Sequence, residues 1–445
     1  MADPRHPRGL VPGTPGRNRH VLDPCVPVLL LRIDPNPFHH GTLGAVRSLG
    51  RCGVEVHVAA EADRSPVARS RFVRQMHPPP PPGAPLDEVA AVLRRIAARI
   101  ARPAVLIPMD DAGAVAVSRL GEALSGAFLL PDQPGHLAER VADKALLPEL
   151  CRGVGIAHPA TVEPRDEREA AAAVGDLGAP VVAKWSRPWL LPPDAGLRST
   201  CLISTPQEAR SLYRRGLGTG SALLLQKHLA PGGGDWFCHG YADGSGRLHG
   251  GGAGTKHRSW PRGAGLTAVG RWTPVPELQG MVERLVGELN YRGIFDIDFR
   301  VDPETGRYCL LDFNPRPGAQ FRLFADAGGL DVVRAQYLDL THQRLPAGRA
   351  LPGRTFVVEN YAPLSALRAL VSAALPGRRT SPLREPAWHA PDDPAPARHM
   401  AAEWSRHAAR RLLRRSGPPS AALPGHRTEP PVTTRTTPDE RKASC

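Results

Sequence analysis

The chain has 445 residues, of which 41% are hydrophobic, and it carries a formal net charge of +14. Such a length predicts about two or three packed domains with real cores. No apolar run reaches the roughly 18 residues of a membrane span. The seven scattered cysteines contain no C-x-x-C pair, which argues against a disulfide framework or a zinc site. Residues 1–20 lack an apolar run, so we expect no signal peptide and a cytoplasmic protein.

The first third of the chain reads as alternating strands and helices. Residues 1–26 are rich in Pro, Arg and Gly and are predicted to be disordered. Strands are then expected over 27–33, 54–60 and 103–111, and helical patterns over 41–53 and 85–101. This alternation is typical of a parallel, doubly wound sheet. Because "GTLGAVRSLG" is not G-x-G-x-x-G, the sequence predicts a Rossmann-like domain over 27–134 that binds no dinucleotide.

Two polar pairs stand at loops of this domain. Asp110 and Asp111 end the third expected strand, where α/β folds present substrate contacts. A helix N-cap for the following segment is the favoured interpretation of this pair. His39 and His40 have no spaced partner and are read as loop residues.

From about residue 135 the pattern becomes mixed, which favours an α+β module packed on the first domain. One helix is expected from residue 135 to Gly153 or Gly155, and another over 275–290. Strands are expected over 179–186, 200–205 and 221–230, and as a hairpin over 235–254. Residues 376–445 are again rich in Pro, Ala and Arg and are predicted to form a disordered tail. Within it, 398–416 is either a solvated, fraying segment or a short basic helix that binds a partner or an anionic surface.

A polar hairpin is the strongest functional signal. In "GIFDIDFRVD" (293–302), Asp296 and Asp298 share one face and apolar residues fill the other. After the "DPETG" turn, Leu310, Asp312 and Asn314 are expected on one face of the return strand. Asp298 then falls opposite or diagonal to Asp312, within roughly 5–8 Å.

Facing carboxylates are destabilising unless a cation lies between them. Together with the amide oxygen of Asn314 they form an all-oxygen set, which suits Mg²⁺ bound with nucleotide phosphates. The alternative is a solvated hairpin face that ends in an Asn-Pro turn.

Lysine is rare among the 57 basic residues and occurs only as Lys144, Lys184, Lys227, Lys256 and Lys442. A lysine is a compact point charge that reaches a phosphate oxygen from a narrow site. The alternative explanation is a codon bias toward arginine that leaves only a few lysines in the chain.

The hairpin and the segments before it resemble the ATP-grasp ligases. "GIFDIDF" followed by "LLDFNPRPGAQ" looks like the metal-binding hairpin of that family. Upstream, "ADKALLPELCRGVGIAHPAT" and "GAPVVAKWS" look like its two phosphate-lysine segments, and "LLLQKHLAPGGGDWFCHG" like its adenine-side hinge. "GTKHRSWPRGAG" looks like a basic segment beside the phosphates, and the first domain, with "EADRSPVARSRFV", is similar to the pre-ATP-grasp domain of carboxylate–amine ligases.

The resemblance covers roughly residues 27–340 and implies a domain order and an activity. It implies a pre-ATP-grasp domain over 27–134, a two-lobed ATP-grasp domain over 135–345 and a core extension over 346–375. The implied activity is an ATP- and Mg²⁺-dependent ligase that joins a small-molecule carboxylate to an amine through an acyl phosphate. No specific nucleic-acid partner is expected, because aromatic residues make up only 5% and no recognition motif occurs.

The same resemblance assigns roles to individual residues. The implied set is Lys144 and Lys184 for the ATP phosphates, Gln226, Lys227 and Asp235 for the adenine and ribose side, Asp298, Asp312 and Asn314 for Mg²⁺, Arg316 for the transferred phosphate or the substrate carboxylate, and Lys256 and Arg258 for the acyl-phosphate side.

Two departures from the family pattern keep a second reading open. Lys227 stands after Gln226 where the family usually has Glu, and the loop over 187–200 is rich in proline with a single glycine. Prolines remove backbone N–H donors that could wrap phosphate. The alternative is therefore a degenerate ATP-grasp protein that binds nucleotide as a regulator or scaffold without ligase activity.

Overall fold

The computed structural model describes residues 22–260, 266–362 and 384–415, and three β-sheets organise them. Most of the predicted disordered N-terminal segment, residues 1–21, lies outside the described residues. Among the described residues, no helix is long and apolar enough to cross a membrane. Short 3-10 turns occur at Pro66–Arg69, Pro188–Leu190, Pro231–Gly233 and Phe321–Phe324.

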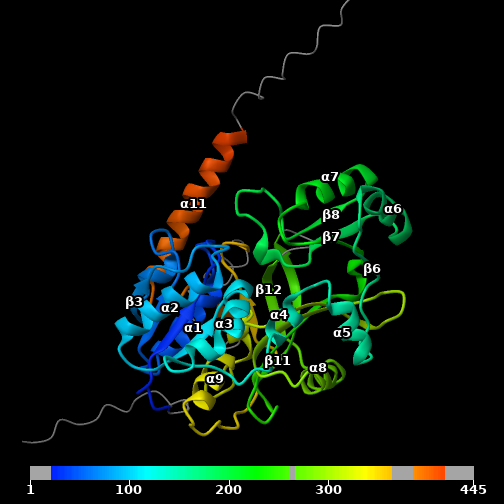
Figure 1. Ribbon diagram of the computed structural model, residues 1–445. Coiled ribbons are helices and arrows are strands. Elements are labelled where there is room, and N and C mark those ends of the chain that lie inside the picture. The colour runs from blue at the N-terminus through cyan, green and yellow to red at the C-terminus, as the bar shows by residue number, and fades with distance from the viewer. Residues whose placement is uncertain (1–21, 261–265, 363–383, 416–445) are drawn as a thin grey trace, which may run out of the picture. The chain divides into compact units, whose positions relative to one another are not determined.

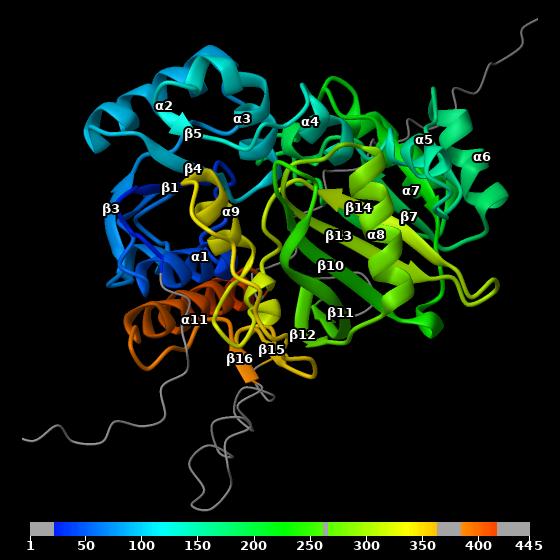
Figure 2. The ribbon, with the colours of Figure 1, turned by 90° about the horizontal axis from the view of Figure 1, so that it is seen from below.

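A parallel sheet of five strands, in the order β3-β2-β1-β4-β5, forms the N-terminal domain (Figure 2). Its elements are β1 (Val28–Leu31), α1 (His40–Gly50), β2 (Val56–Ala59), β3 (Val73–His77), α2 (Leu86–Ile100), β4 (Ala104–Pro108), α3 (Asp111–Leu124) and β5 (Phe128–Leu129). Helices α2 and α3 bury Leu93 and Val117 against Leu29 and Leu31 of β1, and α1 lies on the opposite face of the sheet. The predicted doubly wound sheet is confirmed. The prediction that His39 and His40 both lie in a loop is wrong for His40, which is the first residue of α1.

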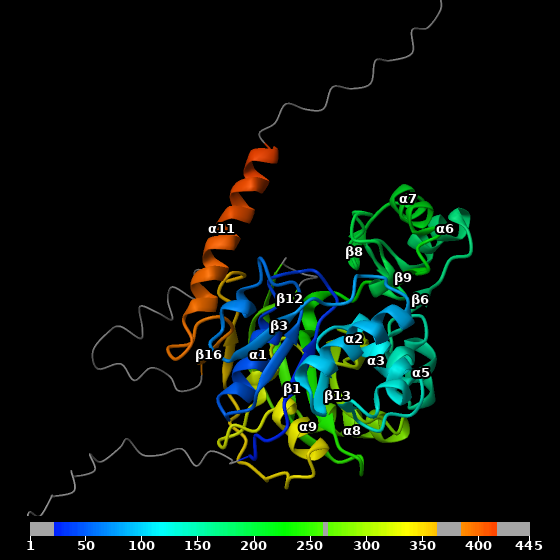
Figure 3. The ribbon, with the colours of Figure 1, turned by 60° about the vertical axis from the view of Figure 1, so that its left-hand side comes forward.

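A smaller antiparallel sheet, in the order β6-β9-β7-β8, carries two helices on one face (Figure 3). Its elements are β6 (Thr161–Val162), α6 (Glu167–Leu177), β7 (Val181–Trp185), β8 (Thr200–Ile203), α7 (Pro206–Gly216) and β9 (Leu223–Lys227). Val181, Ala183 and Trp185 point into the core under the helices. Because side chains alternate along a strand, Lys184 points to the opposite face of this sheet.

A seven-stranded sheet, in the order β14-β13-β10-β11-β12-β15-β16, forms the largest layer (Figure 2). Its strands are β10 (Asp235–Ala242), β11 (Leu248–Trp260), β12 (Leu266–Trp272), β13 (Gly293–Val301), β14 (Tyr308–Asn314), β15 (Thr355–Val357) and β16 (Arg384–Pro386). The associated helices are α4 (Leu137–Ala142), α5 (Leu147–Gly153), α8 (Pro276–Glu288) and α9 (Val332–Leu340). Ile297, Phe299 and Phe313 pack under α4, α5 and α8, which leaves the acidic residues of β13 on the other face.

The helix predicted from residue 135 to Gly153 or Gly155 ends at Gly153 as predicted, but it is interrupted, so the prediction of one continuous helix is wrong. Helix α4 ends at Ala142 and α5 begins at Leu147, next to Pro148, which the first turn of a helix tolerates. Asp143 is extended, and its Oδ1 accepts a hydrogen bond from the Ala145 N–H at 3.0 Å. The N–H of Lys144 then donates to the Ser186 carbonyl at 2.9 Å. The break therefore ties Lys144 to the end of β7.

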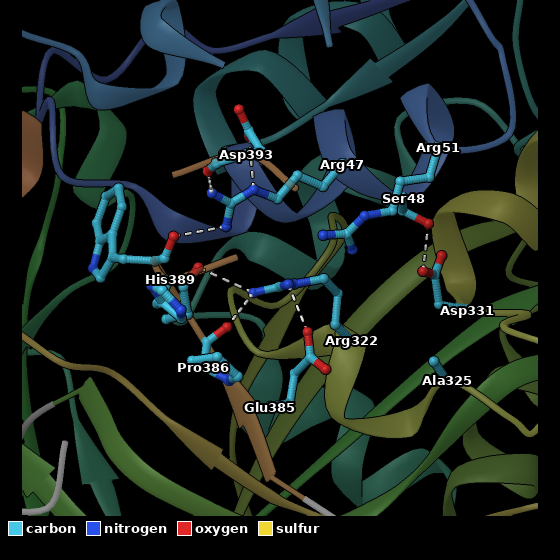
Figure 4. A network of polar contacts seen from close by, with 12 residues as sticks. Arg47, Ser48, Arg51, Arg322, Ala325, Asp331, Glu385, Pro386, His389 and Asp393 are labelled. Carbon is cyan, nitrogen blue, oxygen red and sulfur yellow. Dashed lines mark hydrogen bonds and ion pairs between the residues drawn. The ribbon is translucent and has the colours of Figure 1, made fainter. Parts of the chain in front are cut away.

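The structure also differs from the predicted disordered tail over residues 384–402. Here β16 pairs with β15, and Trp388 is fully buried. The buried Arg47 of α1 pairs with Asp393 at 2.9 Å and donates to the Trp388 carbonyl at 2.8 Å (Figure 4). Burial of a large aromatic ring and a paired charge offsets the ordering entropy of this segment. These two anchors, the buried Trp388 and the Arg47–Asp393 pair, cannot be recognised in a composition rich in Pro, Ala and Arg.

Helix α11 (Ala395–Arg415) shows that the described part of 398–416 is helical (Figure 1). The binding role of this helix stays a prediction. Residues 376–383 and 416–445 of the predicted tail lie outside the described residues.

Candidate active site

The polar hairpin forms with the predicted pairing. Strands β13 and β14 are antiparallel, and the register pairs Asp298 with Asp312 and Asp296 with Asn314. The side chains of Asp298 and Asp312 are 22% and 24% exposed. Two carboxylates thus face each other across neighbouring strands in a mostly buried setting, which is the arrangement expected from the alternation in the sequence.

A β-bulge changes one detail of this hairpin. The register shifts after Asp298, so Phe299 pairs with Leu310 and Leu311 becomes the extra residue. The predicted position of Leu310 on the face of Asp312 is therefore wrong, and Leu310 is buried in the core with Phe299. The bulge leaves the Leu311 carbonyl free to accept a hydrogen bond from Lys184 Nζ at 3.2 Å.

Three lysines converge on the two facing carboxylates from different elements. Lys144, at the break between α4 and α5, places Nζ 2.5 Å from Asp312 Oδ1. Lys184 of β7 places Nζ 3.4 Å from the same oxygen. Lys256 of β11 lies 2.7 Å from Asp298 Oδ1. These lysines come from separate layers of the fold, which the codon-bias explanation does not predict.

Arg316, in the loop after β14, lies between two further carboxylates. Its Nη1 is 2.9 Å from Asp296 Oδ2, and its Nε is 3.2 Å from Asp111 Oδ1. The other oxygen of Asp296 is 3.0 Å from Nε2 of the buried His239. The favoured N-cap reading is confirmed at Asp110, whose side chain accepts from the Gly113 N–H at 2.7 Å.

Asp111, Asp296 and His239 were not among the predicted site residues. For Asp296 the signal was present, because it shares a strand face with Asp298. For Asp111 the signal was its place at the carboxyl end of β4. His239 sits on an apolar strand and pairs with Asp296 only through the register of β10 with β13, so no local pattern marks it.

The residues predicted for the adenine and acyl-phosphate sides make other contacts. Gln226 is buried and donates to Thr161 Oγ1 at 3.0 Å. Lys227 pairs at the surface with Glu304 at 2.9 Å, and Asp235 pairs with Arg300 at 2.5 Å. Arg258 is exposed farther along β11. Within the described ranges, neither Lys227 nor Arg258 forms an ion pair with the facing carboxylates.

The electrostatics of the cluster follow from burial and pairing. Burial would raise the pKa of Asp312, but Lys144 and Lys184 outweigh it and hold the pKa well below its usual range. Burial lowers the pKa of Lys184, and Asp312 only partly opposes this effect. For Lys144 the Asp312 carboxylate outweighs burial and raises the pKa. The Asp312 carboxylate therefore stabilises the ammonium group of Lys144 more than that of Lys184.

Asp298 behaves in the opposite way to Asp312. Burial raises its pKa, Lys256 opposes this, and the neighbouring carboxylates Asp296 and Asp312 add to the rise. Added positive charge between Asp298 and Asp312 would relieve this repulsion.

The residues present fit a Mg²⁺ ion that is shared with phosphates. Among the described residues, no group of three or more His, Cys, Asp or Glu side chains is placed to hold a metal ion by itself. Mg²⁺ is commonly bound by one or two carboxylates together with substrate phosphates and waters. Asp298, Asp312 and the amide of Asn314 supply hard oxygen donors of this kind, and the repulsion at Asp298 favours a cation.

No family model and no curated protein matches the sequence. Solved structures match over most of the chain. An ADP complex of N5-carboxyaminoimidazole ribonucleotide synthetase matches with a TM-score of 0.57 and 13% identity, covering 79% of this chain and 87% of that chain. An L-amino acid ligase from Bacillus licheniformis matches with a TM-score of 0.54 and 13% identity, covering 75% and 79%.

The biotin carboxylase domain of 2-oxoglutarate carboxylase from Hydrogenobacter thermophilus, in complex with MgADP, ADP and bicarbonate, matches with a TM-score of 0.53. Its identity is 16%, covering 74% of this chain and 72% of that chain. These matches show that the chain has the ATP-grasp fold, with a Rossmann-like domain before the two ATP-grasp lobes. At these identities the matches establish only the fold, and the reaction has to be inferred from the residues of the site.

Proposed function

We propose that the protein is an ATP- and Mg²⁺-dependent ligase that joins a carboxylate to an amine. The observation that carries the proposal is the convergence of Lys144, Lys184 and Lys256 on the facing pair Asp298–Asp312. Phosphoryl transfer requires positioned cations more than covalent help from the protein. The ATP-grasp fold supplies the setting in which such a cluster binds nucleotide phosphates.

The reaction would proceed in two balanced steps. A carboxylate oxygen of the substrate attacks the γ-phosphorus of ATP, the bond from that phosphorus to the β,γ-bridging oxygen breaks, and ADP leaves. The amine nitrogen then attacks the acyl carbon, the bond to the phosphate oxygen breaks, and phosphate leaves as the nitrogen loses a proton. The acyl phosphate is needed because an unactivated carboxylate offers no good leaving group.

Each polar side chain has a role in this scheme. Lys144 and Lys184 would turn from Asp312 to the phosphates, and Lys256 and Arg258 would line the side of the acyl phosphate. Arg316 would hold the transferred phosphate or the substrate carboxylate. Asp298, Asp312 and Asn314 would hold Mg²⁺, which supplies positive charge for the phosphates when it is bound.

The nucleoside end of ATP would lie on the side of β9. Gln226, Lys227 and Asp235 are the proposed contacts for adenine and ribose. In the structure Lys227 is paired with Glu304 and Asp235 with Arg300. To bind the nucleoside, Lys227 and Asp235 would have to leave these partners or contact the ligand in addition to them.

A second candidate is a degenerate ATP-grasp protein that binds nucleotide without ligase activity. The surface pair of Lys227 with Glu304 and the proline-rich loop over 187–200 favour it, since both remove expected contacts to ATP.

Trapping with hydroxylamine separates the two candidates. The intact protein is incubated with MgATP, hydroxylamine and single carboxylic or amino acids, and ADP and acyl hydroxamate are measured. A ligase produces both in equal amounts, and Asp312→Asn abolishes both. Nucleotide binding without any ADP or hydroxamate, across the panel, would instead establish the degenerate protein.

A further inference from the structure

The N-terminal sheet presents a second polar site at its carboxyl edge. The strand order reverses between β1 and β4, which pair in parallel. In open α/β sheets, ligands bind in the crevice outside the strands at such a reversal. The residues that follow the two strand ends here are Arg32 on one side and Asp110–Asp111 on the other.

Arg32 is a buried cation with an unused donor. The residue is 5% exposed, and among the described residues its Nε has no hydrogen-bond partner. Its Nη1 donates to the Asn36 carbonyl, and its Nη2 lies 3.4 Å from Asp34, whose side chain is 52% exposed. A buried guanidinium N–H without an acceptor is unfavourable. An incoming anion would satisfy it.

His39 adds a neutral donor in the same loop. Its Nδ1 caps α1 by accepting from the Thr42 N–H at 3.1 Å, which assigns the ring proton to Nε2. Burial, together with the charges of Arg32 and Arg316, holds the pKa of His39 well below its usual value. The ring is thus neutral and keeps an Nε2–H that can donate.

Close backbone contacts place this loop beside the candidate active site. A β-carbon on Gly41 would lie 2.9 Å from Ala319 Cα and 3.0 Å from His39 Cε1. His39 therefore lies against the loop that carries Arg316. Asp110 accepts from the N–H groups of Ile33 and Asp34 at 2.6 and 2.7 Å, and its neighbour Asp111 pairs with Arg316.

The nearby carboxylates are already engaged. Both oxygens of Asp110 accept backbone N–H groups, and Asp296 lies between His239 and Arg316. Asp111 holds Arg316. Asp34 pairs with Nη2 of Arg32. Among the described residues, Nε of Arg32 still lacks an acceptor, and His39 keeps its Nε2–H, so these two donors can receive an added anion.

We propose that Arg32 and His39 bind a carboxylate group of a substrate, a subsite that rests on the proposed ligase function. A guanidinium and a neutral imidazole N–H together match the two oxygens of one carboxylate. That carboxylate belongs either to the acid that is phosphorylated or to an amino acid that serves as the amine.

The test compares Arg32→Met, Arg32→Lys and His39→Asn with the wild type and with Arg102→Met. Arg102 is a matched control because it lies in the same domain, is half exposed and pairs with Glu55 at 3.1 Å. Asn is itself a good N-cap, so His39→Asn keeps the helix start and removes the imidazole Nε2–H, leaving a shorter side chain whose amide N–H does not reach as far. ADP release from MgATP is measured with the standard L-amino acids, succinate and ethylamine as probes.

We expect at least one carboxylate probe to stimulate ADP release, and ethylamine alone to have no effect. The KM for that probe should rise on the order of 10-fold to 100-fold in Arg32→Met, the loss of a hydrogen bond to a charged group. It should recover in part in Arg32→Lys, rise less in His39→Asn and stay unchanged in Arg102→Met. The KM for ATP should not change in any of them.

A hydroxylamine arm then distinguishes the two sources of the carboxylate. If Arg32→Met raises the KM for the acid when hydroxylamine serves as the amine, Arg32 binds the acid that is phosphorylated. If Arg32→Met has an effect only when an amino acid serves as the amine, Arg32 binds the carboxylate of that amine substrate. Unchanged KM values in both Arg32→Met and His39→Asn, with a wild type that a carboxylate does stimulate, would overturn the subsite alone. If Arg32→Met does not fold, the KM of His39→Asn for the carboxylate probe decides whether the subsite exists. Failure of the ligase function itself would show separately, as a wild type that forms no ADP and no hydroxamate with any probe, whether or not MgATP shifts its thermal midpoint, and it would overturn the subsite with it.

Discussion

The buried pair Arg47–Asp393 should hold the C-terminal segment on the N-terminal domain, and Arg47→Met tests this directly. The two side chains are 0% and 1% exposed, so solvent screens their attraction little. Arg47 also donates to the Trp388 carbonyl at 2.8 Å and to the Asp393 carbonyl at 2.7 Å. Removing one partner of a buried pair typically costs about 3–5 kcal/mol, because the other charge stays buried alone. We expect a fall of several degrees in the thermal midpoint.

Two further variants make this prediction specific. Arg51→Met removes a similar pair with Asp392, at 2.8 Å, whose side chains are 28% and 44% exposed. An exposed pair contributes about 0–1 kcal/mol, so this control should change little. The double variant Arg47→Met with Asp393→Leu should recover part of the lost stability, since no buried charge remains unpaired. Recovery is incomplete because Ser70 Oγ and the Arg71 N–H lose Asp393 as their acceptor. If the two single losses simply add, or if Arg47→Met matches Arg51→Met, the reasoning is refuted.

Two other predictions concern the candidate site. The pKa of Asp312 is depressed, so its stabilising effect is complete above about pH 4 and is lost as the pH falls through the lower folded-state value. Denaturation in urea at several pH values should therefore show a smaller loss of stability below pH 4 in Asp312→Asn, and equal losses would contradict the pairing with lysines. A β-carbon on Gly318 would lie 2.2 Å from His239 Cε1 and 2.7 Å from Asp296 Cγ. Gly318→Ala should reduce ADP release strongly, whereas Gly121→Ala, with nothing within 4 Å, should not; equal activities would show that the His239–Asp296 contact is dispensable.

The sequence predicts much of the fold because strong periodic signals coincide with the elements. The alternation of Asp and apolar residues over 293–302 predicts both the strand and the pairing of Asp298 with Asp312. What it cannot predict is a register shift inside a strand, as at Leu311, since a bulge depends on contacts across strands. The interrupted helix at Asp143–Leu146 does have a local signal, because Pro148 fits only the first turn of a helix. The hydrogen bond from Lys144 to Ser186, which ties the break to β7, is not visible in the sequence.

The candidate site was predicted best where several residues share one strand. Lys144, Lys184 and Lys256 meet the hairpin as the lysine distribution indicated, although Lys227 instead pairs at the surface. Asp111 was left out because the pair Asp110–Asp111 was assigned to a helix N-cap. His239 was missed because it enters the site only through the pairing of β10 with β13. The anchors of the C-terminal segment were missed for the same reason, since one buried Trp and one Asp do not alter a composition typical of disorder.

The most direct test of the nucleotide site is thermal unfolding of the intact protein with and without MgATP, beside Lys184→Ala. A ligand at about 100 times its Kd adds about 2.7 kcal/mol to the free energy of unfolding, which shifts the midpoint by several degrees. We predict such a shift in the wild type, dependent on Mg²⁺, and its loss in Lys184→Ala. The surface variant Arg102→Met, which removes the pair with Glu55 in the N-terminal domain, should keep it. No shift in the wild type, or an undiminished shift in Lys184→Ala, would contradict the assignment of the lysine–aspartate cluster to the ATP phosphates.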